Sequence, residues 1–185
     1  LLARAFDFDA DEVFDEKKAV FLVNETGRIP FASVAWPGLV GVVSGMNRAG
    51  LAVVVHGARG GPARTVGEPV VQELRRLLSC AGTTAEALRI IGETEPLVSH
   101  LVVVNDADGY AAKIERVPGS PPFVEELGER GVVTNHLEGP FASDPRNLRI
   151  RASTSTLARH ARGSELVRDL TGPATVGDAV RLLRD

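Results

Sequence analysis

Residues 44–56 read SGMNRAGLAVVVH, and the fold prediction starts from this stretch. β-Favouring residues stand on both sides of a short turn-forming segment, Asn47–Gly50. Asn and Gly accept the left-handed backbone that tight turns between antiparallel strands require. The stretch therefore predicts two antiparallel strands joined by a turn.

The flanking sequence repeats this alternation of β-favouring runs and turn residues. In the first third, such runs stand at Ala19–Val23, Phe31–Trp36, Leu39–Ser44 and Leu51–His56. Later runs stand at Ser99–Asn105 and Tyr110–Val117, joined by the turn sequence DADG, and a short one stands at Val132–Thr134. Short consecutive strands bounded by Gly, Pro and Asn favour an antiparallel meander or layered sheet.

Between the two groups of strands, the apolar residues change to a helical spacing. The spacing predicts a helix that opens near Pro69 and ends at Gly82, with one apolar face formed by Val70, Leu74, Leu77, Leu78 and Ala81. A second helix is expected to follow at once, because Thr83 and Glu86 have the spacing of a capping box.

Helices are also predicted in the last quarter of the chain. Ser143 is the expected cap of one, with Pro145 in its first turn, and Thr175 with Asp178 marks the start of the last. Helices packed on a sheet make an α+β layered domain, which we expect to span residues 1–185 as a single unit. The last helix has no Gly, Asn or Pro to end it, so we expect the domain to continue beyond the sequence.

The composition limits the classes of function. The chain has 185 residues, and 44% of them are hydrophobic. Its net charge is -3, and it lacks the basic stripe expected of a surface that binds nucleic acid or an anionic membrane. No run reaches the ~20 apolar residues needed to span a bilayer. The single cysteine excludes an intrachain disulfide, and the scattered histidines predict no local metal cluster. No cofactor is expected.

Two residues could be taken for nucleophiles on sequence grounds. Ser44 follows GVV and precedes Gly45, one place away from the G-x-S-x-G pattern, so it is a weak candidate. Cys80 stands beside the apolar stripe of a predicted helix, where free cysteines are usually small core residues.

Four short stretches carry a more specific signal when they are taken in order. They are RAFD at 4–7, SGMNRAGLAVVVH at 44–56, VVTNH at 132–136 and ASDPRNLRIR at 142–151. In this order the chain resembles the penicillin acyltransferase-like family of N-terminal-nucleophile hydrolases over nearly its whole length. The resemblance implies a four-layer αββα sandwich, here incomplete at both ends. It also implies self-cleavage of a precursor to free an N-terminal cysteine, which attacks an amide.

The resemblance also implies partners and a place for the nucleophile. The partners are a small N-acyl amide or acyl donor and the remainder of the precursor chain. The family's R-x-x-D stretch lies shortly after the nucleophile and matches Arg4 and Asp7, so the cysteine is expected upstream of Leu1. Arg4 would then steady the thiolate and the substrate carbonyl, and Asp7 would orient the free amine.

The residues themselves leave another interpretation of Arg4 and Asp7 open. Residues three apart on a regular strand point to opposite faces, so a bend or bulge is needed to bring both into one site. Without such a bend or bulge, the segment is an edge strand in which Arg4 lies along the apolar surface and Asp7 is in solvent.

Asn135 follows a predicted strand, and by resemblance it is an oxyanion donor. Its alternative role is a turn asparagine that binds its own backbone. His136 beside it is expected to be structural. His56 stands where the family usually has an asparagine and is expected to contact the substrate. Arg146, on one helical face with Arg149, could reach a substrate carboxylate, although solvated arginines are the usual case.

Two other classes of function stay open beside the amide hydrolase or acyltransferase. One is a non-catalytic binding module that keeps the fold, and the other is a structural part of a larger assembly. The sequence does not determine the acyl group or the amine of the substrate. It also does not determine the oligomeric state or the cellular compartment.

Overall fold

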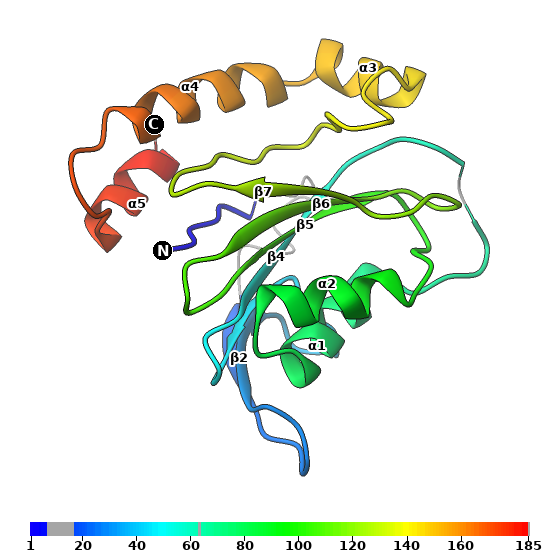
Figure 1. The fold of residues 1–185 in the computed structure, drawn as a ribbon, viewed down its shortest axis with the longest axis vertical. Coiled ribbons are helices and arrows are strands. Elements are labelled where there is room, and N and C mark those ends of the chain that lie inside the picture. The colour runs from blue at the N-terminus through cyan, green and yellow to red at the C-terminus, as the bar shows by residue number, and fades with distance from the viewer. Residues whose placement is uncertain (7–16, 63, 185) are drawn as a thin grey trace.

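A computed structural model describes residues 1–6, 17–62 and 64–184. Its strands form one seven-stranded antiparallel sheet in which each strand pairs with the next along the chain (Figure 1). They are β1 (Ala19–Val23), β2 (Phe31–Ala35), β3 (Ser44–Asn47), β4 (Ala52–Gly57), β5 (His100–Asn105), β6 (Ala111–Arg116) and β7 (Phe123–Leu127). The predicted meander is confirmed.

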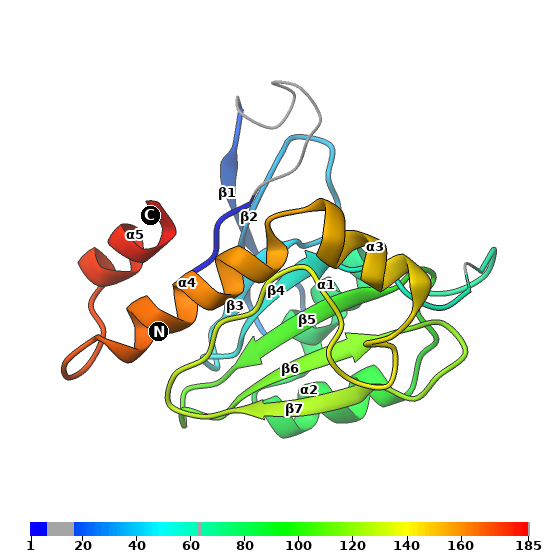
Figure 2. The ribbon, with the colours of Figure 1, turned by 90° about the horizontal axis from the view of Figure 1, so that it is seen from above.

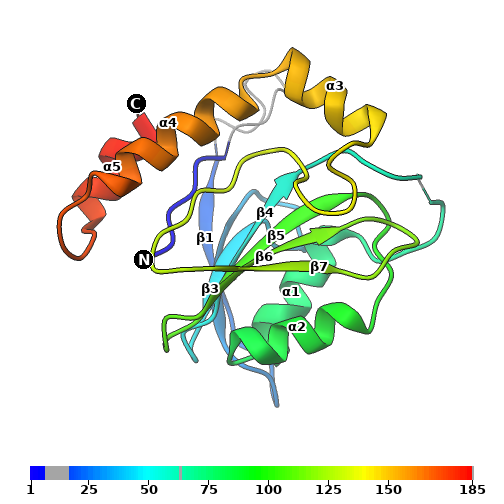
Figure 3. The same ribbon diagram turned by 45° about the horizontal axis from the view of Figure 1, so that its top comes forward.

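Helices lie on both sides of this sheet. They are α1 (Val70–Cys80), α2 (Thr84–Gly92), α3 (Pro145–Ser153), α4 (Thr156–Arg168) and α5 (Val176–Arg184). Figures 1 and 2 show α1 and α2 against one face, with α3 and α4 across the other. The extended segments 1–6 and 129–135 run between the sheet and α4 (Figure 3). The predicted α+β class is confirmed, and none of the described helices is long and apolar enough to cross a membrane.

The main core lies between the sheet and the first two helices. Leu74 and Leu77 of α1 are fully buried against Val53, Val102 and Ile114 of the strands. Burial of each such side chain stabilises the fold by about 1.5–3 kcal/mol. The helical spacing seen in the sequence is the spacing of this buried stripe.

The turn at Asn47–Gly50 ties the β3–β4 hairpin to the end of α1. The buried Asn47 side chain accepts hydrogen bonds from the backbone N–H groups of Ala49 and Leu51 through Oδ1. Its Nδ2 donates to the carbonyls of Leu78 and Ala81. The residue that makes the turn therefore also fixes where the helix packs.

Apart from shifts of one residue at strand ends, the strands differ from the sequence prediction in three respects. The strand expected at Leu39–Ser44 begins at Ser44 instead, because Gly41 passes so close to α1 that a Cβ atom there would lie 2.5 Å from the Cβ of Val71. Residues 132–134 are extended but form no strand, since Thr134 bonds to α4. Another strand, β7, was not predicted at all.

The helix caps agree with the sequence except at α3. Thr83 accepts from the Glu86 N–H, and Thr175 accepts from the Asp178 N–H, as their spacing predicted. The cap of α3 is Asp144 rather than Ser143, because the Asp144 carboxylate accepts from the Arg146 N–H. Asp144 thereby starts the helix that carries Arg146.

Candidate active site

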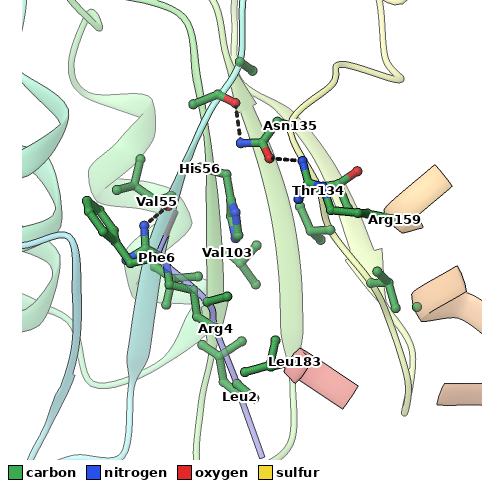
Figure 4. A pocket seen from close by; sticks show the side chains of 18 of the residues that line it. Leu2, Arg4, Phe6, Val55, His56, Val103, Thr134, Asn135, Arg159 and Leu183 are labelled. Carbon is green, nitrogen blue, oxygen red and sulfur yellow. Dashed lines mark hydrogen bonds between the residues drawn. The ribbon is translucent and has the colours of Figure 1, made fainter. Parts of the chain in front are cut away.

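A groove lies over the face of the sheet that carries α3 and α4, and its lining also includes Val70 and Val71 at the start of α1. The N-terminal segment, β4, β5, residues 127–135 and the helices α3 to α5 all contribute to its walls. Arg4, His56, Asn135 and Arg146 line this one groove, and Figure 4 shows three of them around the end of β4. Asp7 lies outside the described residues.

The end of the β3–β4 pairing explains why polar side chains gather there. The paired residues run from Met46↔Ala52 to Ser44↔Val54, and Val55 and Gly57 lie beyond the last pair. Carbonyl groups beyond the end of the strand pairing lack a partner on β3, and side chains supply one here. Arg4 Nη2 donates to the Val55 carbonyl at 2.9 Å, and Asn135 Nδ2 donates to the Gly57 carbonyl at 3.0 Å.

Arg4 is held by more than this one contact. Its Nη1 donates to Ser44 Oγ at 2.8 Å, and its guanidinium lies 4.4 Å from the centroid of the Phe6 ring. Its Nε is buried and has no acceptor among the described residues. Burial lowers the pKa of Arg4 to about 10, which leaves the side chain cationic at neutral pH.

His56 lies on β4 between the two carbonyls, with its ring facing the groove (Figure 4). Burial lowers the pKa of His56 to about 4, and the charges of Arg4 and Arg159 act in the same direction. The imidazole is therefore neutral near pH 7. A neutral ring offers one donor and one acceptor, as a polar substrate contact requires.

Helix α4 binds both the backbone and the side chain of Asn135. Its backbone N–H donates to Thr156 Oγ1 at 2.8 Å, and its Oδ1 accepts from Arg159 Nη2 at 3.0 Å. The neighbouring Thr134 hydroxyl donates to the Thr156 carbonyl at 3.1 Å. These contacts hold Asn135 in an extended segment that no sheet pairing supports.

Arg146 lies at the start of α3, where it donates to the Gly61 carbonyl. Asp144 accepts from the Gly61 N–H at 3.0 Å, and this hydrogen bond lowers the pKa of the Asp144 carboxyl. The first turn of α3 is thus joined to the loop that follows β4. Arg146 reaches the groove from the far side of that loop.

The groove combines an apolar wall with basic side chains. Apolar side chains come from both ends of the chain, from the end of β7, and from α4 and the residues that follow it, namely Leu2, Phe6, Leu127, Leu166, Leu170 and Leu183. Glu129 is acidic, but most of the charged residues that line it are basic, namely Arg4, Lys17, Arg59, Arg130, Arg146, Arg159 and Arg162. In the described part of the chain, no group of three His, Cys, Asp or Glu side chains could hold a metal ion.

Arg159 was not predicted from the sequence, and Cys80 is less buried than the core position expected for it. An exposed arginine on a basic helix carries no signal of its own, and only the contact with Asn135 singles Arg159 out. Cys80 ends α1 on the other face of the sheet, and its Sγ accepts from Arg28 Nη1 at 2.9 Å. It is half-buried at the edge of the core rather than fully enclosed.

Solved structures with the same fold include three hydrolases. A Caenorhabditis elegans ortholog of N-acylethanolamine-hydrolyzing acid amidase has a TM-score of 0.74 at 16% identity, over 99% of this chain and 80% of that one. Penicillin V acylase from Agrobacterium tumefaciens has a TM-score of 0.58 at 18% identity, over 84% of this chain and 54% of that one. A variant of conjugated bile acid hydrolase from Clostridium perfringens has a TM-score of 0.63 at 8% identity, over 91% of this chain and 71% of that one.

These likenesses establish the N-terminal-nucleophile hydrolase fold that the resemblance implied. The described residues are consistent with its αββα sandwich and form one sheet with helices on both faces. A comparison with curated proteins finds no match. Residues 1–185, the whole of the sequence, match the family described as acyl-coenzyme A:6-aminopenicillanic acid acyl-transferase. The chain therefore belongs to the acyl-coenzyme A:6-aminopenicillanic acid acyl-transferase family.

Proposed function

We propose that this chain is part of an autoproteolytically processed enzyme that hydrolyses a small N-acyl amide or transfers its acyl group. The proposed nucleophile is a cysteine upstream of Leu1, freed as a new N-terminus when the precursor is cleaved. Its α-amino group takes the thiol proton, and the ordinary pKa of such a group, about 7.7–8.0, suits a base near neutral pH. Membership of the acyltransferase family supports this class of reaction.

The observation that carries the proposal is the arrangement around His56. Arg4 and Asn135 are far apart in the sequence, yet they bind the carbonyls of Val55 and Gly57 on either side of it. Alternate residues of a strand are about 6.6–6.8 Å apart, so a cation and a neutral amide flank one small space. A thiolate and a substrate carbonyl need such a pair of groups.

In the proposed reaction, the thiolate adds to the amide carbonyl carbon. A C–S bond forms, and the carbonyl π electrons move to the oxygen. Asn135 Nδ2 carries a second N–H beyond the one given to Gly57, and this N–H donates to the oxyanion. Arg4 steadies the thiolate, and Asp7 orients the amine that serves as the base.

Collapse of this intermediate breaks the C–N bond. The amine leaves with the proton that the α-amino group had taken, and an acyl thioester stays on the cysteine. Water or an acceptor amine then releases the acyl group. We assign substrate contacts to His56 and Arg146, and the basic lining favours a substrate with an anionic group.

The test uses the protein expressed from its full reading frame. Intact mass and N-terminal sequence define the mature protein, and a panel of N-acyl amides measures turnover. Replacement of the upstream cysteine by alanine is expected to abolish both processing and turnover. Cys80→Ala is the matched control, because Cys80 lies on the other face of the sheet, and it is expected to preserve both.

Two results would contradict the proposal. If Cys80→Ala abolishes turnover, or if residues 1–185 alone turn over an amide and alkylation of Cys80 stops it, the nucleophile has been misassigned. An unprocessed protein that binds N-acyl amides without turning them over would be a binding module instead.

A further inference from the structure

The side-chain amide of Asn135 has two ends, and each faces a different chemical group. Its Oδ1, which only accepts hydrogen bonds, faces the cationic Arg159 Nη2 at 3.0 Å. Its Nδ2, which only donates, faces the Gly57 carbonyl at 3.0 Å. Rotation of the amide by half a turn would set donor against donor and acceptor against acceptor. Only one orientation satisfies both neighbours.

Helix α4 supplies one partner to the backbone of Asn135 and one to its side chain. Thr156 is fully buried, and it binds the Asn135 N–H through Oγ1. Arg159 follows three residues later, so it lies on the same face of the helix. Its Nε also donates to Ser155 Oγ at 3.1 Å, which steadies the guanidinium.

We propose that Arg159 is a positioning residue that holds the Asn135 amide with its free N–H toward the groove. This inference rests on the proposed role of Asn135 as oxyanion donor. Without Arg159, only the Gly57 carbonyl still disfavours the flipped form, so that form becomes more populated. The flipped amide presents Oδ1, a repulsive acceptor, to the developing negative charge. The charge of Arg159 on Oδ1 also polarises the amide and strengthens its N–H as a donor.

The kinetic test uses the mature enzyme with Arg159→Met, the conservative Arg159→Lys, and Arg168→Met as control. Arg168 is an exposed arginine of the same helix outside the groove lining, so its replacement removes an equal charge. Two substrates are compared, one with a neutral leaving amine and one with an anionic amine. Arg159→Met is expected to lower kcat about tenfold for both, with KM changed less than about twofold. Arg159→Lys is expected to recover part of the loss, and Arg168→Met to match wild type.

A double-mutant cycle separates positioning from an independent role. If Arg159 acts through Asn135, then Arg159→Met in the Asn135→Ala background costs less than about twofold in kcat. Fully additive losses would overturn the inference. A rise in KM confined to the anionic-amine substrate, with kcat preserved, would also overturn it, because Arg159 would then bind substrate.

A second readout needs no turnover, so it separates failure of the inference from failure of the proposed function. In nuclear magnetic resonance spectra, the Asn135 side-chain NH₂ is expected to show contacts with the Hα protons of Gly57. These contacts should weaken in Arg159→Met and persist in Arg168→Met. If wild type hydrolyses no amide, the proposed function is wrong, yet this result still supports Arg159 as the group that orients the amide. Contacts of equal strength in all three proteins would overturn the inference.

Discussion

On β4, Val53 and Val55 point into the core under α1, whereas their direct neighbours Val54 and His56 face the groove. The same alternation on β6 buries Ile114 on the helix side. One set of strands therefore builds two different surfaces. The core side is closed by helices that follow in sequence, while the groove side is assembled from segments at both ends of the chain. Stability is concentrated on the first surface and chemistry on the second.

The core side also holds a buried ionic cluster that sharpens this contrast. Glu73 of α1 is fully buried, with Oε2 2.9 Å from His100 Nε2 and Oε1 3.2 Å from Arg116 Nε. Every charge in this cluster has its partner nearby. In the groove, by contrast, the hydrogen-bond partners of Arg4 are neutral groups, the Ser44 hydroxyl and the Val55 carbonyl.

The largest effect is expected from Glu73→Ala. The change leaves the buried guanidinium of Arg116 without its carboxylate, and loss of one partner of a buried pair costs about 3–5 kcal/mol of the free energy of unfolding. Urea denaturation measures the loss. If Glu73→Ala is as stable as wild type, water reaches this cluster and the core side is not sealed.

Next in size is Asn135→Ala, tested in the mature enzyme. Loss of one oxyanion donor is expected to lower kcat by about two to three orders of magnitude with little change in KM. Asn135→Asp should be at least as damaging, because a carboxylate would face the developing anion. Retained kcat with weakened substrate binding would show instead that Asn135 binds the ground state.

A smaller effect is expected from the titration of His56. Its pKa of about 4 in the folded protein is below the ordinary value of about 6.5, so the unfolded chain binds a proton first. Stability is therefore expected to fall as the pH drops from about 6.5 to about 4, and to lose no more below that. His56→Asn should flatten this part of the stability curve. Identical curves for the two proteins would mean that His56 is not buried between cations.

The smallest effect is the loss of a helix cap, and here the two sides can be compared directly. Thr83→Ala on the core side and Asp144→Ala on the groove side should each cost about 1 kcal/mol of stability. Only Asp144 also binds the Gly61 N–H, beside the groove. Asp144→Ala alone is therefore expected to raise KM, and an equal rise in Thr83→Ala would remove the distinction.

The core side could be predicted from the sequence because its signals are local. The turn at Asn47–Gly50 and the helical spacing of Leu74 and Leu77 depend on neighbouring residues, and the structure confirms them. The strand expected at 39–44 was misplaced because Gly41 packs against Val71, a contact between separate elements. β7 was missed because it is a polar edge strand, in which Glu125 pairs with the buried Lys113.

The groove side could be predicted only in part. The resemblance singled out Arg4 and Asn135, and both line the groove, but their roles in catalysis stay predictions. Arg159 had no signal, because its importance lies in one contact across 24 residues. Residues 132–134 have the composition of a strand, and only the bonds to α4 explain why they form none.

The most direct test is a crystal structure of the mature enzyme trapped with a slowly released acyl group. We expect a thioester on the N-terminal cysteine, with its carbonyl oxygen about 2.7–3.1 Å from Asn135 Nδ2. We also expect Asn135 Oδ1 to accept a hydrogen bond from Arg159 in that structure. An acyl group on any other residue, or a carbonyl oxygen turned away from Asn135, would contradict it.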